Sequence, residues 1–193
     1  MSPAPARTSQ EAIAAAARRI LESEGLSAVT MRAVAEAVGV RGPSLYKRYA
    51  DHAALLRAVS ESVVADLSRT LAGTGSGQDP RADLRAVAFE YRAFVHRNPN
   101  GYRLLFADLP ADASPDPADL AAMGMPLVHA TVRLVGEAQA LEAARTMVAW
   151  AHGFVSMELA GAFRLGGDLD EAYAFGIDAI LTGLSEVGTP ASR

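Results

Sequence analysis

Residues that favour the α-helix, with apolar side chains at helical spacing, run through almost the whole sequence. Alanine accounts for 40 of the 193 residues, whereas there are only four isoleucines and 12 aromatic residues. Alanine, leucine and arginine are strong helix formers, while β-branched and aromatic residues favour strands. The sequence therefore predicts an all-α protein with enough chain to bury a core.

Capping residues and apolar periodicity divide the sequence into helices. Thr30 is a suitable N-cap and Gly39 a suitable stop for a short helix, and Asp51 can cap a long one. The predicted helices span residues 8–24, 31–38 and 43–49, a long segment after Asp51, and then residues 81–97, 102–107, 118–135, 137–164 and 169–187.

One glycine-rich segment, residues 73–80 (GTGSGQDP), separates the two halves of the chain. No strand precedes it and no Lys-Ser/Thr pair follows, so it predicts a flexible turn rather than a phosphate-binding loop. We expect a domain boundary here, with one domain at residues 1–70 and a second at 71–193.

Charge is distributed unevenly between these parts. Residues 1–50 contain seven basic and four acidic side chains, a net charge of +3, whereas residues 51–193 contain 11 basic and 18 acidic ones, a net charge of −7. The total of −4 argues against a nucleic-acid partner, but the basic N-terminal part is suited to contact a polyanion.

Several function classes are excluded by residue content. There is no cysteine, the four histidines lack metal-ligand spacing, and no serine lies in a nucleophile elbow. We therefore expect no metal, no cofactor, no catalytic residue and no enzyme activity. The charge-free stretches 120–132 and 146–157 are too short to cross a bilayer, and no apolar leader precedes Glu11. The sequence thus predicts a cytoplasmic, nucleoid-associated protein without a membrane partner.

The short helices on either side of Gly39 have the sequence pattern of a helix-turn-helix. Ala35 is small enough for a close helix crossing, Gly39 can adopt the positive φ of the turn, and Pro43 fits the first turn of the second helix. The apolar residues expected to hold the crossing are Val34, Val38, Val40 and Leu45.

The second of these helices has an apolar back and a polar, cationic front. Leu45 and Tyr49 share one face, Ser44 and Lys47 lie opposite, and Tyr46 is on a flank. Such a helix suits insertion into a major groove. Tyr46 and Tyr49 can either reach DNA through their hydroxyls or simply belong to the core, and the sequence leaves both possibilities open.

The stretch TMRAVAEAVGVRGPSLYKRYADHAALL, residues 30–56, resembles the DNA-binding domain of the tetracycline-repressor (TetR) family. The resemblance covers residues 8–70, and GVRGPSLYKRY is its most specific part. It implies an all-helical homodimer that binds a palindromic operator in double-stranded DNA. It also implies a repressor whose C-terminal domain binds a small effector that releases the DNA.

The resemblance also assigns roles to residues, with two departures. It implies base contacts by Gly42, Ser44, Tyr46 and Lys47, and contacts near backbone phosphates by Thr30, Arg48 and Tyr49. Arg41 stands where a capping serine is common, so a cap is lost and a DNA-reading cation is gained. His52 stands where a lysine usually meets a phosphate, and we expect a weaker, pH-sensitive contact there.

Small residues form stripes on the last two predicted helices, and we expect these stripes in a two-fold dimer interface. The alternative is close packing inside an alanine-rich chain. The stripes consist of Ala149, Gly153 and Ala160, with Met157 among them, and of Ala172, Gly176, Ala179 and Gly183.

Aromatic and methionine side chains concentrate in the second half of the chain and can line a cavity for a hydrophobic effector, or form plain core. The run AWAHGF (149–154) is similar to the Trp-His-Gly signature of a TetR C-terminal subgroup, as is AFVHRNPNGYRLLF (93–106). His152 is the polar candidate, although a lone histidine can be a satisfied core residue. The candidate ligand-binding residues are Tyr91, Phe94, Phe106, His129, Trp150, His152, Phe154 and Met157.

We therefore expect a ligand-responsive DNA-binding transcriptional regulator. The alternative is a helical small-molecule-binding protein or enzyme that has lost specific DNA binding. The intact second helix of the helix-turn-helix argues against this alternative, and the His52 replacement argues weakly for it.

Overall fold

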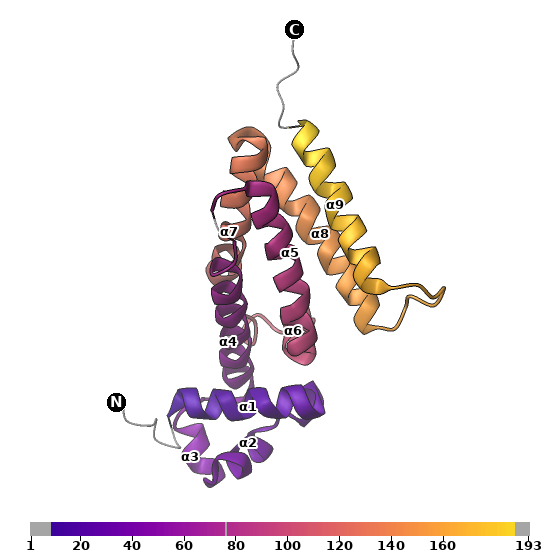
Figure 1. The fold of residues 1–193 in the computed structure, drawn as a ribbon. Helices are drawn as coiled ribbons and strands as arrows, with labels where there is room; N and C mark the ends of the chain where they lie inside the picture. The colour runs from indigo at the N-terminus through magenta and orange to yellow at the C-terminus, as the bar shows by residue number, and fades with distance from the viewer. Residues whose placement is uncertain (1–8, 76, 188–193) are drawn as a thin grey trace. The chain divides into compact units, whose positions relative to one another are not determined.

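The computed structural model describes residues 9–75 and 77–187, which form nine α-helices, two 3-10 helices and no strand (Figure 1). The all-α prediction is confirmed. The elements are α1 (Gln10–Glu24), η1 (Leu26–Ala28), α2 (Met31–Val38), α3 (Gly42–Tyr46), α4 (His52–Ala72), α5 (Pro80–Arg97), α6 (Pro99–Leu105), α7 (Pro117–Val135), η2 (Glu137–Gln139), α8 (Ala140–Leu159) and α9 (Leu169–Val187).

Three helices differ from their predicted extents by three or more residues at one or both ends. α3 ends at Tyr46 and is followed by a turn, in which the main-chain N–H groups of Arg48 and Tyr49 both donate to the carbonyl of Leu45. α6 begins at Pro99, where proline occupies the first turn at no cost in hydrogen bonds. α8 ends at Leu159, shortly before Gly161, which has a φ of +62°. The predicted start of the first helix at Thr8 lies outside the described residues.

The chain divides into two compact units. The first contains the chain up to Asp66 together with Asn98–Ala121, and the second contains Leu67–Arg97 together with the chain from Ala122 onward. Each unit is therefore built from separate stretches of sequence. The division into functional domains at residue 70 remains a prediction.

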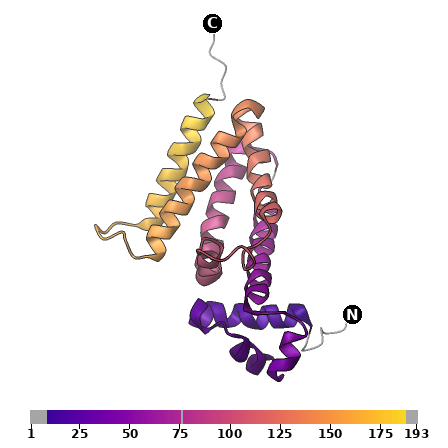
Figure 2. The same ribbon diagram turned by 180° about the vertical axis from the view of Figure 1, so that it is seen from behind.

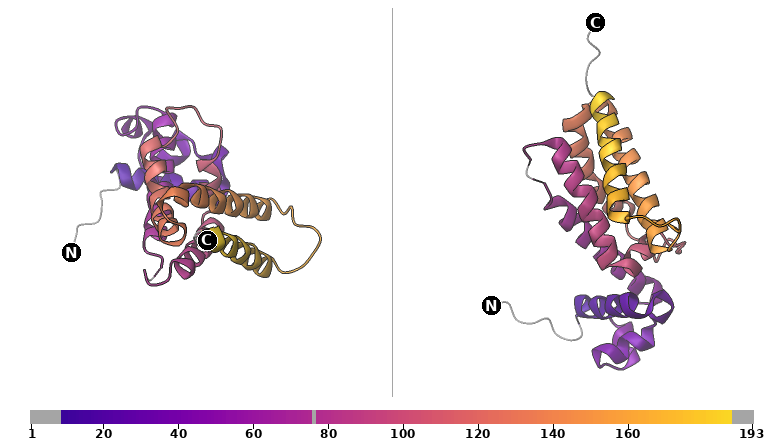
Figure 3. Two further views of the ribbon diagram at one scale, coloured as in Figure 1. Left: turned by 90° about the horizontal axis from the view of Figure 1, so that it is seen from above. Right: turned by 45° about the vertical axis from the view of Figure 1, so that its right-hand side comes forward.

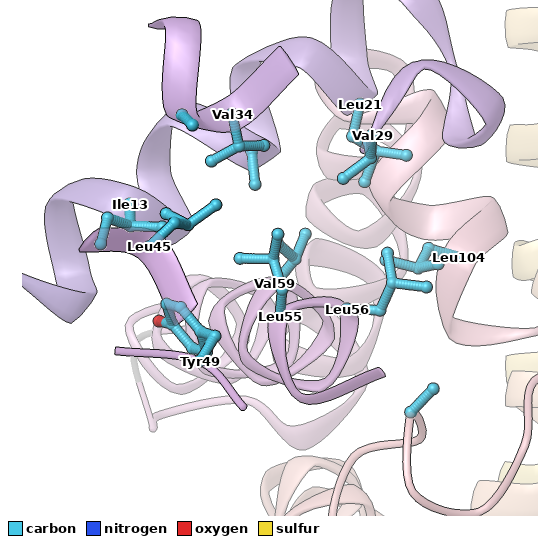
Figure 4. Close-up of a cluster of buried hydrophobic side chains, with 13 residues drawn as sticks. Ile13, Leu21, Val29, Val34, Leu45, Tyr49, Leu55, Leu56, Val59 and Leu104 are labelled. Carbon is cyan, nitrogen blue, oxygen red and sulfur yellow. The ribbon is translucent and has the colours of Figure 1, made fainter. Parts of the chain in front are cut away.

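The core of the first unit lies between α1, the α2–α3 pair and the start of α4 (Figure 4). Ile13 of α1 and Leu45 of α3 face each other, and Leu55 and Val59 of α4 close the cluster. Every one of these side chains is at most 1% exposed, so burial fixes the orientation of the short α3 helix. Leu104 and Ala113 add the later part of the chain to the same core.

α6 is fastened to α1 by the carboxylate of Glu22. Its two oxygens accept hydrogen bonds from the main-chain N–H groups of Asn100 and Gly101, at 3.1 and 2.9 Å. A side chain at position 101 would collide with this carboxylate and with Val63 of α4, because a Cβ there would lie 2.7 Å from Glu22 Oε1. Glycine thus permits the close approach of α6 to α1 and α4.

The second unit packs α5, α8 and α9 around Tyr173, which is fully buried. α8 and α9 run side by side in both Figure 1 and Figure 2, and the connection between them extends away from both helices (Figure 3). The Tyr173 hydroxyl donates to the carbonyl of Ala88 on α5, at 2.8 Å, so this buried polar group is satisfied.

In the glycine-rich segment before α5, Gly77 contacts a buried carboxylate, and the flexibility of this segment remains a prediction. The buried carboxylate of Asp83 accepts a hydrogen bond from the N–H of Gly77 at 3.0 Å and forms an ion pair with Arg133 at 3.0 Å. Arg133 also donates to the carbonyl of Gly77, at 2.7 Å. Gly75 and Gly77 adopt positive φ values of +99° and +73°, which glycine reaches without steric cost.

Candidate nucleic-acid interface and effector region

Local hydrogen bonds fix the helix-turn-helix geometry as the sequence predicts. Thr30 Oγ1 accepts a hydrogen bond from the N–H of Ala33, at 3.1 Å, and so caps α2. Gly39 adopts the left-handed conformation with φ of +73°, and the N–H of Val40 returns to the carbonyl of Ala35, at 2.9 Å. The turn therefore directs the chain straight from α2 into α3.

α3 buries one face and exposes the other. Leu45 is fully buried, whereas Tyr46 is 54% exposed and Gly42 is half-buried at the start of the helix. The remaining predicted DNA-contacting side chains around α3 are exposed, namely Arg41, Ser44, Lys47 and Arg48. The exposed side of α3 is thus polar and is flanked by exposed cations, which suits a helix that enters the major groove.

Tyr49 is a core residue, which favours the second of its two sequence-based interpretations. It is only 7% exposed, and its hydroxyl donates to the carbonyl of Gln10 on α1, at 2.9 Å. Burial, together with the nearby carboxylates Glu11 and Glu61, raises the pKa of Tyr49. The hydroxyl donates to α1, so Tyr49 fastens the turn after α3 to α1. A contact of Tyr49 near a backbone phosphate remains a prediction.

Gln10 is a residue of this surface that sequence reasoning missed. Its side-chain amide donates to the carbonyl of Arg48, at 2.9 Å, across 38 residues of sequence. Gln10 and Tyr49 therefore tie the start of α1 to the turn after α3. No local sequence signal marks such a contact, because it depends on two segments that meet only in the folded chain.

The two departures from the family pattern also have clear structural consequences. Arg41 occupies the N-cap position of α3 and makes no side-chain capping bond, so its exposed guanidinium remains available for DNA. His52 is exposed at the start of α4, and its Nε2 lies 2.6 Å from the carbonyl oxygen of Val29.

The candidate effector residues do not form one cluster. Trp150 and Phe154 pack together at 5.3 Å, and both contact Tyr173, at 5.4 and 5.1 Å. Phe163, which follows α8, contacts Phe154 at 4.8 Å. Tyr173 is thus the centre of this aromatic cluster, and it was not among the predicted ligand-binding residues.

The other candidates differ in environment. Phe94 is buried and Tyr91 is half-buried on α5, whereas His129 and Met157 are exposed. Phe106 is 56% exposed and belongs to the first unit, where it packs on Tyr102 at 5.0 Å. Desolvation lowers the pKa of half-buried His152, which favours the neutral imidazole at pH 7.

An ion-pair network beside the aromatic cluster links α5, α8 and α9. Arg92 donates to both carboxylate oxygens of Glu158, at 2.9 and 2.6 Å, and to Asp170 at 2.7 Å. His96 Nε2 lies 3.0 Å from Glu158, and the Arg92 guanidinium lies 5.1 Å from the Tyr173 ring centroid. The hydrogen bond from Arg92 lowers the pKa of Glu158, against the opposing effect of burial.

Most residues of the two small-residue stripes are exposed on α8 and α9. Phe175 on α9 is 78% exposed, so a large apolar side chain accompanies them. Gly176 is different, because it is half-buried and a Cβ there would collide with the Trp150 indole of the same chain. The exposed members are Ala149, Gly153, Ala160, Ala172, Ala179 and Gly183.

Among the described residues, no group of three or more His, Cys, Asp or Glu side chains is arranged to hold a metal ion. No helix in residues 9–75 and 77–187 has the length and apolarity needed to span a bilayer.

The fold and the exposed cations on either side of α3 together define a helix-turn-helix DNA-binding protein. The sequence matches the model of bacterial regulatory proteins of the tetR family over residues 13–59, and the model of the tetracyclin repressor-like C-terminal domain over residues 84–180. It is also 33% identical to an uncharacterized HTH-type transcriptional regulator of Mycobacterium tuberculosis, over 81% of this chain and 73% of that protein.

Solved structures share the fold along most of the chain. A variant of TetR from Acinetobacter baumannii, in complex with minocycline, is 23% identical, covers 93% of this chain and 98% of its own, and has a TM-score of 0.69. BioQ of Mycobacterium smegmatis is 25% identical, covers 92% and 98%, and has a TM-score of 0.68. BioQ has also been solved with its natural double-stranded DNA operator, with a TM-score of 0.67.

The chain belongs to the tetR family of DNA-binding transcriptional regulators. The resemblance of AWAHGF to the Trp-His-Gly subgroup remains a prediction, because the description of the matching C-terminal model does not name it.

Proposed function

We propose that the protein is a ligand-responsive repressor that binds a palindromic operator as a homodimer. The observation that carries this proposal is the arrangement of α3, whose apolar face is locked to α1 and α4 while Ser44, Tyr46 and Lys47 are exposed. In this proposal Gly42, Ser44, Tyr46 and Lys47 contact base edges, Thr30 and Arg48 contact the backbone, and Arg41 reads either a base or a phosphate. With this division, the phosphate contacts set the position of the protein along the DNA, and the base contacts determine which sequence it recognises.

The homodimer would form through α8 and α9. Exposure of Ala172, Ala179 and Gly183 beside Phe175 supports this interface, since small residues permit close helix approach and an apolar side chain gains from burial. A two-fold dimer presents two copies of α3 to successive major grooves, about 34 to 36 Å apart. The operator is then palindromic.

A small hydrophobic effector would bind in the second unit and release the DNA. The aromatic rings around Tyr173 supply apolar contacts, and half-buried, neutral His152 supplies a polar one. The effector acts only if it binds a DNA-incompetent state more tightly than the DNA-binding state. The chain passes from α5 directly into α6, which Glu22 fastens to α1, and this is the route that we propose for the signal.

Selection from a random pool of double-stranded DNA tests the proposal. The full chain should enrich a palindrome, whereas a small-molecule-binding protein or enzyme that has lost specific DNA binding should enrich none. Arg41→Ala and Lys47→Ala are the informative variants. If neither variant changed the enriched palindrome, the proposal that α3 reads the operator bases would be wrong.

The effector is tested with the same palindrome. Ligands retained by the protein from its host are extracted, identified by mass spectrometry and added to the protein–DNA complex. The expected result is dissociation of the complex, with loss of the response in His152→Phe at unchanged DNA affinity. An effector that acts equally on His152→Phe would remove His152 from the site.

A further inference from the structure

Two hydrogen bonds, which together we call the Gln10 clasp, join the first residue of α1 to the turn that follows α3. The Gln10 side-chain amide donates to the carbonyl of Arg48, and the Tyr49 hydroxyl donates to the carbonyl of Gln10, each at 2.9 Å. The Tyr49 ring is itself held in the buried cluster that contains Ile13 and Leu45 (Figure 4). The main chain at Arg48 and Tyr49 is therefore fastened to α1.

The α3 helix is too short to hold this turn by itself. It has only five residues, whereas isolated helices shorter than about 12 to 15 residues are marginal in water. Its N-cap residue, Arg41, makes no side-chain capping bond. The N–H groups of Arg48 and Tyr49 hold the turn to α3 through the carbonyl of Leu45, and the Gln10 clasp holds the same turn to α1.

We propose that Gln10 is a positioning residue for DNA binding, which holds the main chain of Arg48 in the conformation from which its guanidinium meets a backbone phosphate. The inference rests on the proposed function of this surface, in which Arg48 contacts the DNA backbone. Gln10 itself makes no contact with DNA. A side chain whose main chain is already ordered loses less conformational freedom on binding, so the Gln10 clasp raises the affinity for DNA without adding a contact.

The placement of Arg48 matters because a carboxylate of its own chain attracts it. Glu11 and Arg48 are both exposed and line the same groove between α1 and the turn after α3. The pKa of Glu11 is lowered by hydrogen bonds from its own main chain and from Ser9 and, to a smaller extent, by the positive charge of Arg48. A DNA phosphate must therefore compete with Glu11 for this guanidinium, and the Gln10 clasp fixes the main chain from which Arg48 extends.

The test is a double-mutant cycle of Gln10→Met and Arg48→Ala, which shows whether Gln10 acts through the Arg48 side chain. Methionine keeps the length of glutamine but has no amide to donate to the Arg48 carbonyl. Arg48→Ala removes the guanidinium and keeps that carbonyl. Gln139→Met is the matched control, because Gln139 is exposed and makes no side-chain capping bond at the start of α8.

Binding to a 30-base-pair duplex of mixed sequence is measured by fluorescence anisotropy over a series of salt concentrations, because phosphate contacts do not depend on sequence. Gln10→Met should bind about two- to ten-fold more weakly per bound subunit than the wild type. Arg48→Ala should make the slope of log K against log salt shallower by about 0.9 per subunit, the value for one phosphate contact. In the Arg48→Ala background, Gln10→Met should cause no further loss. Gln139→Met should bind as the wild type does.

Three results would overturn the inference and leave the DNA-binding function intact. The first is an equal loss from Gln10→Met with and without the Arg48 side chain, since Gln10 would then contact DNA itself or support the fold in general. The second is equal affinity of Gln10→Met and Gln139→Met, and the third is an unchanged salt slope in Arg48→Ala. Absence of binding by the wild type at every salt concentration would overturn the proposed function and the inference together.

Discussion

Replacement of Gly176 by alanine tests whether the small-residue stripe on α9 packs inside the chain or against a partner. A methyl group at this position would lie 2.9 Å from Trp150 Cε2 and nearer still to Cζ2 and Cη2. Carbon atoms normally approach to about 3.5 to 4.0 Å, so the nearest edge of the indole must retreat by roughly 1.5 to 2 Å. Phe154 and Tyr173 already pack against the ring, at 5.3 and 5.4 Å, and restrict this retreat.

The expected cost follows from two opposing effects. Overpacking of a filled core costs about 1 to 3 kcal/mol or more, and alanine instead of glycine in a helix returns up to about 1 kcal/mol. We therefore expect Gly176→Ala to lower the free energy of unfolding by about 1 to 2 kcal/mol. For a chain of this length, that corresponds to a decrease in Tm of roughly 2 to 8 °C.

Urea unfolding followed by far-UV circular dichroism and tryptophan fluorescence measures this effect. Trp150 is the only tryptophan, so its emission reports directly on the displaced ring. Gly124→Ala on α7 is the control, because beyond the adjacent residues and the backbone of its own helix no atom lies within 4 Å of the added methyl group, and it should be neutral or stabilising. In a Trp150→Leu background, Gly176→Ala should lose most of its cost. A Gly176→Ala protein as stable as Gly124→Ala, with unchanged emission, would refute the internal packing.

Three further predictions concern capping, pH and base recognition. Thr30→Ala should lower stability by about 1 kcal/mol through loss of the bond to Ala33, and Thr30→Ser should restore most of it; equal losses in both would contradict a capping role. Arg92 lowers the pKa of Glu158 in the folded chain. Their ion pair therefore stabilises the protein at pH values above the ordinary titration range of glutamate, and this stabilisation is lost as the pH falls through the lowered pKa. Urea unfolding should therefore show Glu158→Gln about 2 to 4 kcal/mol less stable at pH 7, with a gap that narrows on acidification; a gap independent of pH would contradict this assignment. Lys47→Ala should weaken binding to the enriched palindrome by about 1 to 3 kcal/mol and relax selectivity at one base pair, whereas an equal loss on every duplex would make Lys47 a phosphate contact.

Local patterns in the sequence were sufficient to predict most helices. The predicted helix at 169–187 coincides with α9, because its apolar periodicity is strong and uninterrupted. The caps at Thr30 and Asp51 and the turn at Gly39 were also predicted, since each depends on neighbours within a few residues.

Contacts between distant segments could not be predicted in the same way. Glu22 is 78 residues from Asn100, and Gln10 is 38 residues from Arg48. Helical spacing shows which face of a helix is polar, but it does not show which partner meets that face. Residues such as Glu22 and Gln10 therefore look like ordinary solvated positions until the chain is folded.

The predictions for the site also depend on whether a residue's environment is set by its own helix or by a distant segment. Exposure of Ser44 and Lys47 and burial of Tyr49 follow from the helical wheel, whereas the hydrogen bond from Tyr49 to Gln10 depends on the packing of α1. The prediction of Gly176 as part of a dimer stripe used spacing alone. The indole of Trp150, which comes from another helix, gives this glycine an internal packing role.

The central claim is that a dimer reads two half-sites through paired α3 helices, and half-site spacing tests it most directly. Affinity is measured for the selected palindrome and for versions with five or ten base pairs inserted at its centre. Insertion of five base pairs rotates one half-site to the opposite face of the duplex, since one turn takes about 10 to 10.5 base pairs. If a dimer reads both half-sites, this insertion should reduce the affinity to that of a single half-site. Unchanged affinity after insertion of five base pairs would contradict it.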